Sequence, residues 1–90
     1  MALVFGRIRI NKPFEHWHQV FLQHREARQA QGIEDVLVAP VIGSQEVIYV
    51  VRTEHPRRVH DMSWGEGARE IIEASGHVLS SERYTVCDEV

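Results

Sequence analysis

The sequence has few of the features that mark secreted, membrane-spanning or nucleic-acid-binding chains. Cys87 is the one cysteine, so no internal disulfide can form, and a free thiol is typical of a reducing compartment such as the cytoplasm. The apolar run from Met1 to Ile10 is too short to cross a membrane and is interrupted by Arg7 and Arg9. Lysines and arginines number 10 against 13 acidic residues and are scattered. We therefore expect a cytoplasmic protein that binds neither membranes nor nucleic acids.

Long runs of Ser, Gly, Gln or Pro are also absent, which excludes a disordered tail or a flexible linker. Hydrophobic residues make up 43% of the 90 residues and charged residues 26%, as in ordinary folded proteins. The length predicts a single domain over residues 1–90. A domain of this size buries only about 60 to 65% of its unfolded surface, so we expect additional stabilisation from oligomerisation.

Four segments have the composition or the alternation of β-strands: Ala2 to Ile10, Asp35 to Ile42, Glu46 to Thr53 and Val78 to Val86. Gly6 interrupts the first of them and is a candidate for a β-bulge. Gly43 and Ser44 separate the second from the third, and they suit a tight hairpin in which glycine takes a positive φ.

Two helices are predicted between the strands. The first covers about residues 13–31, because a proline can open a helix and apolar residues then recur at spacings of three and four. The second begins with a short turn at Pro56 and is broken near Ser63. There Ser63 and Glu66 have the spacing of a capping box that starts the main part of this helix. Gly76 is placed to end it in a left-handed conformation.

This order of elements predicts an α+β fold of the ferredoxin-like type, with a four-stranded antiparallel sheet and two helices on one face. The second and third strands are apolar on both sides, as in strands that are buried on both faces. One of Val50 and Val51 must therefore face away from the helices. Because the helices cover only one face, we expect the other face to be covered in a homodimer.

The six histidines do not have the spacing of a metal site. His16 and His18 would lie about 200° apart on a helix, and His55 and His60 are also unsuitably spaced. His77 follows a predicted helix end, where a charged imidazole would favour the helix dipole. We expect neither a metal nor a cofactor.

His24 differs from the other histidines, because it follows Trp17 by seven positions on the apolar side of the first helix. It is either a hydrogen-bonded core histidine or the polar member of a pocket between helices and sheet. Phe21, Tyr49 and Trp64 could complete an aromatic pocket, although such residues often form only a core.

Other polar residues have simpler interpretations. Four arginines and three glutamates on the strands or just beyond them are interpreted as ion pairs across strands or subunits, with anion binding as the alternative: Arg7, Arg9, Arg52 and Arg83 with Glu46, Glu54 and Glu82. Cys87 has no neighbour in the sequence that would activate a nucleophile. No phosphate-binding glycine loop or catalytic triad order is present.

Two motifs carry a family resemblance: Asn11-Lys12-Pro13-Phe14-Glu15-His16-Trp17 and Ile72-Glu73-Ala74-Ser75-Gly76-His77-Val78. Over nearly its whole length the chain resembles a small bacterial family of unknown function in the dimeric α+β-barrel superfamily. That superfamily includes antibiotic-biosynthesis monooxygenases, haem-degrading monooxygenases, muconolactone-isomerase-like enzymes and stress-responsive barrels. The resemblance implies two sheets packed face to face and a pocket between the sheet and the helices of each subunit.

The sequence disfavours haem binding and RNA binding. The haem-degrading branch uses an Asn on its first strand, a Trp on its second helix and a His ten residues later. Trp64 could match, but position 74 is Ala74 and Asn11 falls after the first strand, so the resemblance implies no haem site. RNA-recognition domains share the element order, but their third strand presents several aromatic residues where this chain has only Tyr49.

Two functions remain open on these grounds. In the first, the protein binds a small apolar or aromatic molecule between sheet and helices at Trp17, Phe21, His24, Tyr49, His60 and Trp64. In the second, it is a cofactor-independent monooxygenase or isomerase in which His24 or His60 carries the proton.

Overall fold

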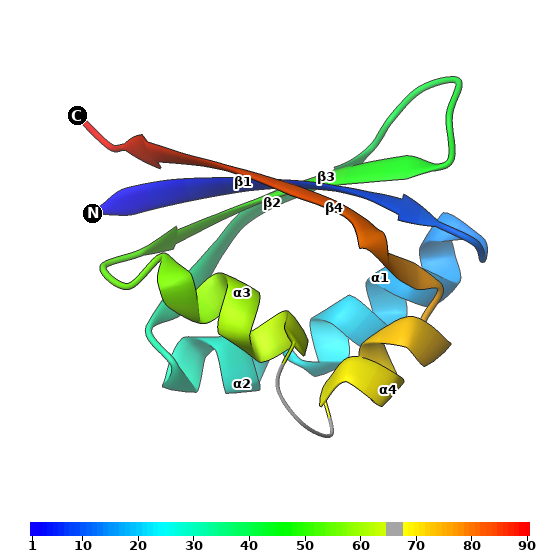
Figure 1. Cartoon of the computed structure of the whole chain (residues 1–90), viewed down its shortest axis with the longest axis horizontal. Coiled ribbons are helices and arrows are strands. Elements are labelled where there is room, and N and C mark those ends of the chain that lie inside the picture. Colours follow the sequence, from blue (N-terminus) through cyan, green and yellow to red (C-terminus); the bar gives the residue numbers. More distant parts are fainter. Residues whose placement is uncertain (65–67) are drawn as a thin grey trace.

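The computed structural model describes residues 1–64 and 68–90, with side chains at 1–62 and 68–90. Within these residues the elements follow one another in the order β1 (Ala2–Ile10), α1 (Phe14–Gln23), α2 (Arg25–Ala30), β2 (Ile33–Pro40), β3 (Glu46–Thr53), α3 (Arg57–Trp64), α4 (Ala68–Ala74) and β4 (His77–Asp88). The strands form a sheet in the order β2-β3-β1-β4, and all neighbours are antiparallel. All these helices lie on one face of the sheet (Figure 1). The predicted α+β ferredoxin-like fold is confirmed.

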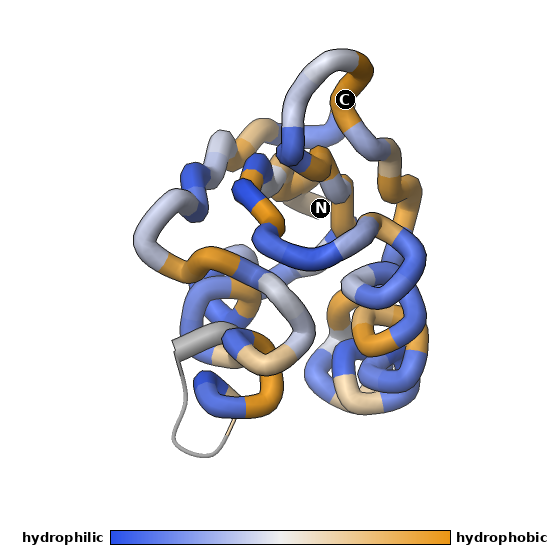
Figure 2. The backbone as a smooth tube through the Cα atoms, turned by 90° about the vertical axis from the view of Figure 1, so that its right-hand side faces the viewer, coloured by the Kyte–Doolittle hydropathy of each residue, from blue (hydrophilic) through white to orange (hydrophobic). Residues whose placement is uncertain are grey.

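The helices form two pairs, and both pairs pack against the same face of the sheet (Figures 1 and 2). One pair is α1 with α2, and the other is α3 with α4. The core lies between the helices and the sheet, and its most deeply buried side chains come from alternate strand positions such as Val4, Ile8, Val47 and Val51. This alternation is what predicted the strands from the sequence.

The first predicted helix is in fact two helices, because it is interrupted at His24. The side-chain Nδ1 of His24 lies 2.8 Å from the carbonyl oxygen of Val20, which is the group that the His24 backbone N–H would reach in a continuous helix. The backbone N–H instead donates to Phe21, one residue nearer. When a side chain hydrogen-bonds to a carbonyl oxygen in place of the backbone N–H, the helix bends or breaks at that residue. The prediction of one helix over 13–31 is therefore wrong at this residue.

The second predicted helix is also divided, and near Ser63 as predicted: α3 ends at Trp64 and α4 begins at Ala68. The predicted cap is wrong, however. Helix α3 continues through Ser63 to Trp64, so Ser63 does not open a helix. Glu66, the other half of the predicted capping box, lies outside the described residues. Gly76 does end α4, with φ at 97°, as the sequence predicted.

Gly6 is not at a bulge, because the register between β1 and β3 is continuous there. Its missing side chain instead makes room for a ring. A Cβ atom at Gly6 would lie 2.2 Å from Cζ of Tyr49, which is far inside van der Waals contact. The glycine therefore lets the Tyr49 ring lie flat against β1 and reach across it.

The face of the sheet away from the helices has an apolar centre between two charged ends. Phe5, Leu37 and Val50 occupy paired positions in its middle. At one end Arg7 pairs with Glu46 through two hydrogen bonds of 2.9 Å. At the other end Arg52 contacts two glutamates, Glu34 at 3.3 Å and Glu89 at 2.7 Å. We call this surface the open face. Val50 lies on it, whereas Val51 points into the core.

Candidate functional site

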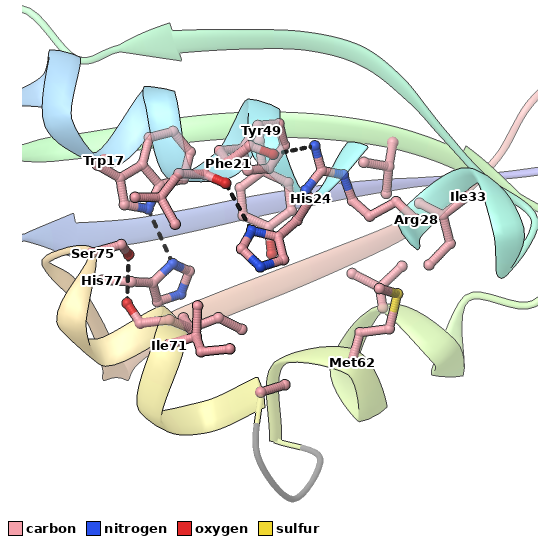
Figure 3. A pocket seen from close by; sticks show the side chains of 15 residues that line it. Trp17, Phe21, His24, Arg28, Ile33, Tyr49, Met62, Ile71, Ser75 and His77 are labelled. Atoms are coloured by element: carbon pink, nitrogen blue, oxygen red, sulfur yellow. Dashed lines mark hydrogen bonds between the residues drawn. The ribbon is translucent and has the colours of Figure 1, made fainter. Parts of the chain in front are cut away.

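A cavity of about 170 Å³ lies between the two helix pairs, under the sheet. Most of its lining is apolar and comes from α1, α3, α4, β2 and β3: Trp17, Val20, Phe21, Ile33, Val51, Val59, Met62, Ala68, Ile71 and Ile72. Five polar residues complete it: His24, Arg28, Tyr49, Ser75 and His77. Figure 3 shows these side chains converging from the helix pairs on either side.

One wall of the cavity is a row of aromatic rings. Trp17 stacks on Phe21 with ring centroids 5.0 Å apart, and Phe21 meets Tyr49 at 6.0 Å. Trp17 and Phe21 are one helical turn apart on α1, so the same spacing that made this face apolar also stacks the rings. Such a wall suits flat apolar molecules.

His24 stands at the break between α1 and α2, and its ring lines the cavity. Because a carbonyl oxygen only accepts, the contact from Nδ1 to Val20 requires a hydrogen on Nδ1. In the neutral ring this leaves Nε2 as an acceptor. The helix break thus fixes both the position and the tautomer of this imidazole.

A buried polar chain runs beside the aromatic wall. Trp17 Nε1 donates to Nδ1 of His77 at 3.2 Å, so the hydrogen of the neutral His77 ring is on Nε2. That Nε2 atom lies 3.4 Å from Oε1 of Glu82, which also accepts a 2.6 Å hydrogen bond from the Tyr49 hydroxyl. The Glu82 side chain is only 1% exposed. Three elements, α1, β3 and β4, are tied together by these four residues.

The contact between His77 and Glu82 depends on a bulge in β4. Two residues five apart on a regular strand point to opposite faces and lie roughly 17 Å apart. Here Val78 pairs with Arg9 but Arg83 already pairs with Arg7, so the bulge gives β4 three extra residues. Because three is an odd number, the residues after the bulge point to the opposite face from the one that regular alternation would give them, and Glu82 lies on the same face as His77. Ser81 secures the bulge by accepting the N–H of Arg9 and donating to the carbonyl of Val78.

The network holds Glu82 in its ionised form. Burial alone would raise the pKa of Glu82, but the close contact with His77 Nε2 and the hydrogen bond from Tyr49 outweigh burial, and its pKa lies below the usual value of 4.5. Burial, together with the nearby Glu82 charge, raises the pKa of Tyr49 well above 10. Tyr49 therefore stays a donor and Glu82 an acceptor at neutral pH.

Arg28 closes the far end of the cavity. Its Nε and Nη2 atoms hold both carboxylate oxygens of Asp35 at 2.7 and 2.8 Å, and Nη2 also donates to the carbonyl of Phe21. The guanidinium lies 3.6 Å from the centre of the Phe21 ring. This pair joins α2 to β2 and neutralises the arginine charge, since both side chains are only 12 to 14% exposed.

We expect Glu82→Gln to lower the free energy of unfolding by about 1 kcal/mol at pH 7, because the buried hydrogen bond from Tyr49 then ends on a neutral amide oxygen instead of a carboxylate. The folded-state pKa of Glu82 is lowered, so the stability that its charge supplies is complete above about pH 4.5 and is lost as the pH falls through the folded value. The difference between wild type and variant should therefore shrink in acid. Urea denaturation from pH 7 to pH 3.5 measures it, with the exposed Glu54→Gln as control. A difference independent of pH would contradict this role.

The structure brings together four of the six residues that the sequence analysis assigned to a pocket. Trp17, Phe21, His24 and Tyr49 line the cavity. His60 does not, because its side chain is 56% exposed on α3 and lies beside Asp61. The side chain of Trp64 lies outside the described residues.

Sequence reasoning missed His77, Glu82 and Arg28. His77 was interpreted as a helix-end histidine, yet it is buried against Trp17. Glu82 was assigned to an ion pair with arginine and instead bonds Tyr49. Of the predicted ion pairs, Arg7 with Glu46 is present, and the carboxylate pKa there is lowered to about 2, chiefly by the hydrogen bond from Arg7.

Within the described ranges, 1–64 and 68–90, no three His, Cys, Asp or Glu side chains are arranged to hold a metal ion. Across the same part of the chain, no helix has the length and hydropathy needed to cross a membrane.

The fold is also that of a known class. A solved structure from Deinococcus radiodurans, of a protein named as a candidate antibiotic biosynthesis monooxygenase, matches all of this chain and 93% of its own chain. The TM-score is 0.60 and the sequence identity is 16%. This likeness confirms, at the level of fold, the predicted resemblance to the antibiotic-biosynthesis-monooxygenase-like proteins. No protein-family profile matches the sequence, and neither does any curated protein.

Proposed function

We propose that this protein binds a small apolar or aromatic molecule in the cavity between its helices and its sheet. The observation that carries the proposal is the cavity itself, about 170 Å³ with a mostly apolar lining and an aromatic wall. An apolar cavity of roughly 150 Å³ is large enough for benzene. The occupant is therefore about the size of one ring with small substituents.

We further propose that the working form is a homodimer joined through the open face. An apolar centre with ion pairs at its margins is the usual composition of a protein interface. Phe5 and Leu37 are 39% and 49% exposed in the single chain, and a second copy would cover them.

We also propose a cytoplasmic location, because the exposed thiol of Cys87 is typical of a reducing compartment.

Binding can be tested with single-ring aromatics against the purified protein by native mass spectrometry and thermal unfolding. We expect a one-to-one complex per chain and a stabilisation of about 1.4 kcal/mol at a ligand concentration tenfold above Kd. Val59→Phe, which places a ring in the cavity, should abolish binding. Val86→Phe adds the same group at a 55% exposed position that does not line the cavity, and it should bind normally. Equal loss in both variants, or no binding by wild type, would contradict the proposal.

A second candidate function is a cofactor-independent monooxygenase or isomerase. Two observations favour it: the imidazole of His24 on the cavity wall, and the name given to the Deinococcus radiodurans protein. In this function His24 Nε2 takes a proton from the bound molecule, whereas His60 is too far out on α3 to contribute. Oxygen consumption or isomer formation with each bound compound separates this function from simple binding.

A further inference from the structure

Three hydrogen-bond donors around the cavity are already committed to other protein groups. The Trp17 N–H donates to His77, and the Tyr49 O–H donates to Glu82. The Ser75 hydroxyl donates to the carbonyl of Ile72. A ligand that only accepts hydrogen bonds therefore finds none of these three donors free.

The charges around the cavity also disfavour an anion. Arg28 lines it, but its charge is compensated by Asp35 at 2.7 Å in a largely buried pair. Glu82 lies directly behind Tyr49 and His77, and it is ionised and almost fully buried. An anionic ligand would enter near this negative charge without an unpaired cation to receive it.

His24 is the exception among the polar lining residues. Its Nδ1–H is used by Val20, so the neutral ring offers Nε2 to the cavity as an acceptor. Two hydroxyl oxygens among the described lining side chains can also accept, those of Ser75 and Tyr49, but these residues are only 4% and 5% exposed. The cavity wall thus offers a hydrogen-bond acceptor on His24, beside the ring of Phe21 (Figure 3).

We propose that the cavity selects neutral ligands that carry one hydrogen-bond donor, such as a hydroxyl on an aromatic ring, and that His24 Nε2 receives this hydrogen. This inference rests on the proposed binding function and adds the chemical class of the ligand. It makes His24 the residue that determines specificity, while the aromatic wall supplies affinity for the ring.

Phenol and toluene are suitable probes, because they have the same shape and differ in the donor. The ratio of the toluene Kd to the phenol Kd is measured at pH 8 for wild type and for His24→Phe. We expect the ratio to fall about tenfold in the variant, because one buried hydrogen bond is lost. His16→Phe makes the same change at an exposed position on α1 and should leave the ratio unchanged.

The nitrogen resonances of His24 in the wild-type protein provide a test that needs no variant. Before ligand is added, Nδ1 should be protonated and Nε2 bare. Phenol should move the Nε2 resonance toward that of a hydrogen-bonded nitrogen, and toluene should not. A ring that carries hydrogen on Nε2 at pH 8, or an Nε2 signal that ignores phenol, would overturn the inference.

The two proposals fail in different ways. If both probes bind and their ratio is the same in wild type and His24→Phe, the ligand class is wrong while the binding function stands. If neither probe binds wild type at millimolar concentration, both proposals are overturned.

Discussion

Val50→Asp should prevent the protein from forming a dimer. Val50 lies in the centre of the open face, between Phe5 on β1 and Leu37 on β2. In a two-fold symmetric dimer the substitution occurs twice and places two unpaired carboxylates in one buried interface. We expect sedimentation at micromolar concentration to show a wild-type dimer and a variant that is monomeric or unfolded.

Because Val50 is only 4% exposed even in the single chain, unfolding of this variant alone would not demonstrate a dimer. Leu37→Asp resolves the ambiguity. Leu37 is 49% exposed in the single chain, so the charge costs little in a monomer and much in a dimer. Leu22→Asp is the control, because Leu22 is equally exposed but lies on α1. A wild-type monomer in the same experiment would refute the homodimer.

Gly6→Ala should destabilise the protein by about 3 kcal/mol. The added Cβ would lie 2.2 Å from Cζ and 2.6 Å from the hydroxyl oxygen of Tyr49, so the ring must move. Displacing the ring combines the cost of overpacking with the loss of its hydrogen bond to Glu82. Urea denaturation measures the change.

A double-mutant cycle identifies the cause. In a Tyr49→Leu background the ring is gone, and Gly6→Ala should then cost less than about 1 kcal/mol. The two substitutions should therefore be strongly non-additive. Additive costs would mean that Gly6 is needed for its backbone and not for the space that it leaves to Tyr49.

The sheet could be predicted because each strand obeys local rules. The boundaries of β1 and β3 follow from alternation and β-branched residues, and the positive φ of Gly76 follows from its place after α4. The choice between Val50 and Val51 could not be made in advance. A strand that is apolar on both sides has no pattern that tells its faces apart until its register with β1 is known.

The candidate site was predictable only where it depends on helical spacing. Trp17, Phe21 and His24 share one side of a continuous helical pattern, so their convergence could be inferred. The pair of His77 and Glu82 could not, because a regular strand would separate them and only the bulge in β4 reverses the alternation. The interruption at His24 could not be predicted from the helical spacing, because it arises from one side-chain contact with Val20.

The pairing of β1 with β4 also bears on how the protein folds. Ala2 pairs with Asp88, so the sheet is completed by pairing segments from opposite ends of the sequence, with β4 as its edge strand. Pairing of such distant segments is slow, because the chain loses entropy on closing the long loop before the contacts between β1 and β4 can form. Because His77 belongs to β4 and lines the cavity, the cavity is incomplete in a partly folded chain in which β4 has not yet paired. Ligand binding and global folding should therefore be linked, and a bound molecule should slow hydrogen exchange throughout the sheet rather than near the cavity alone.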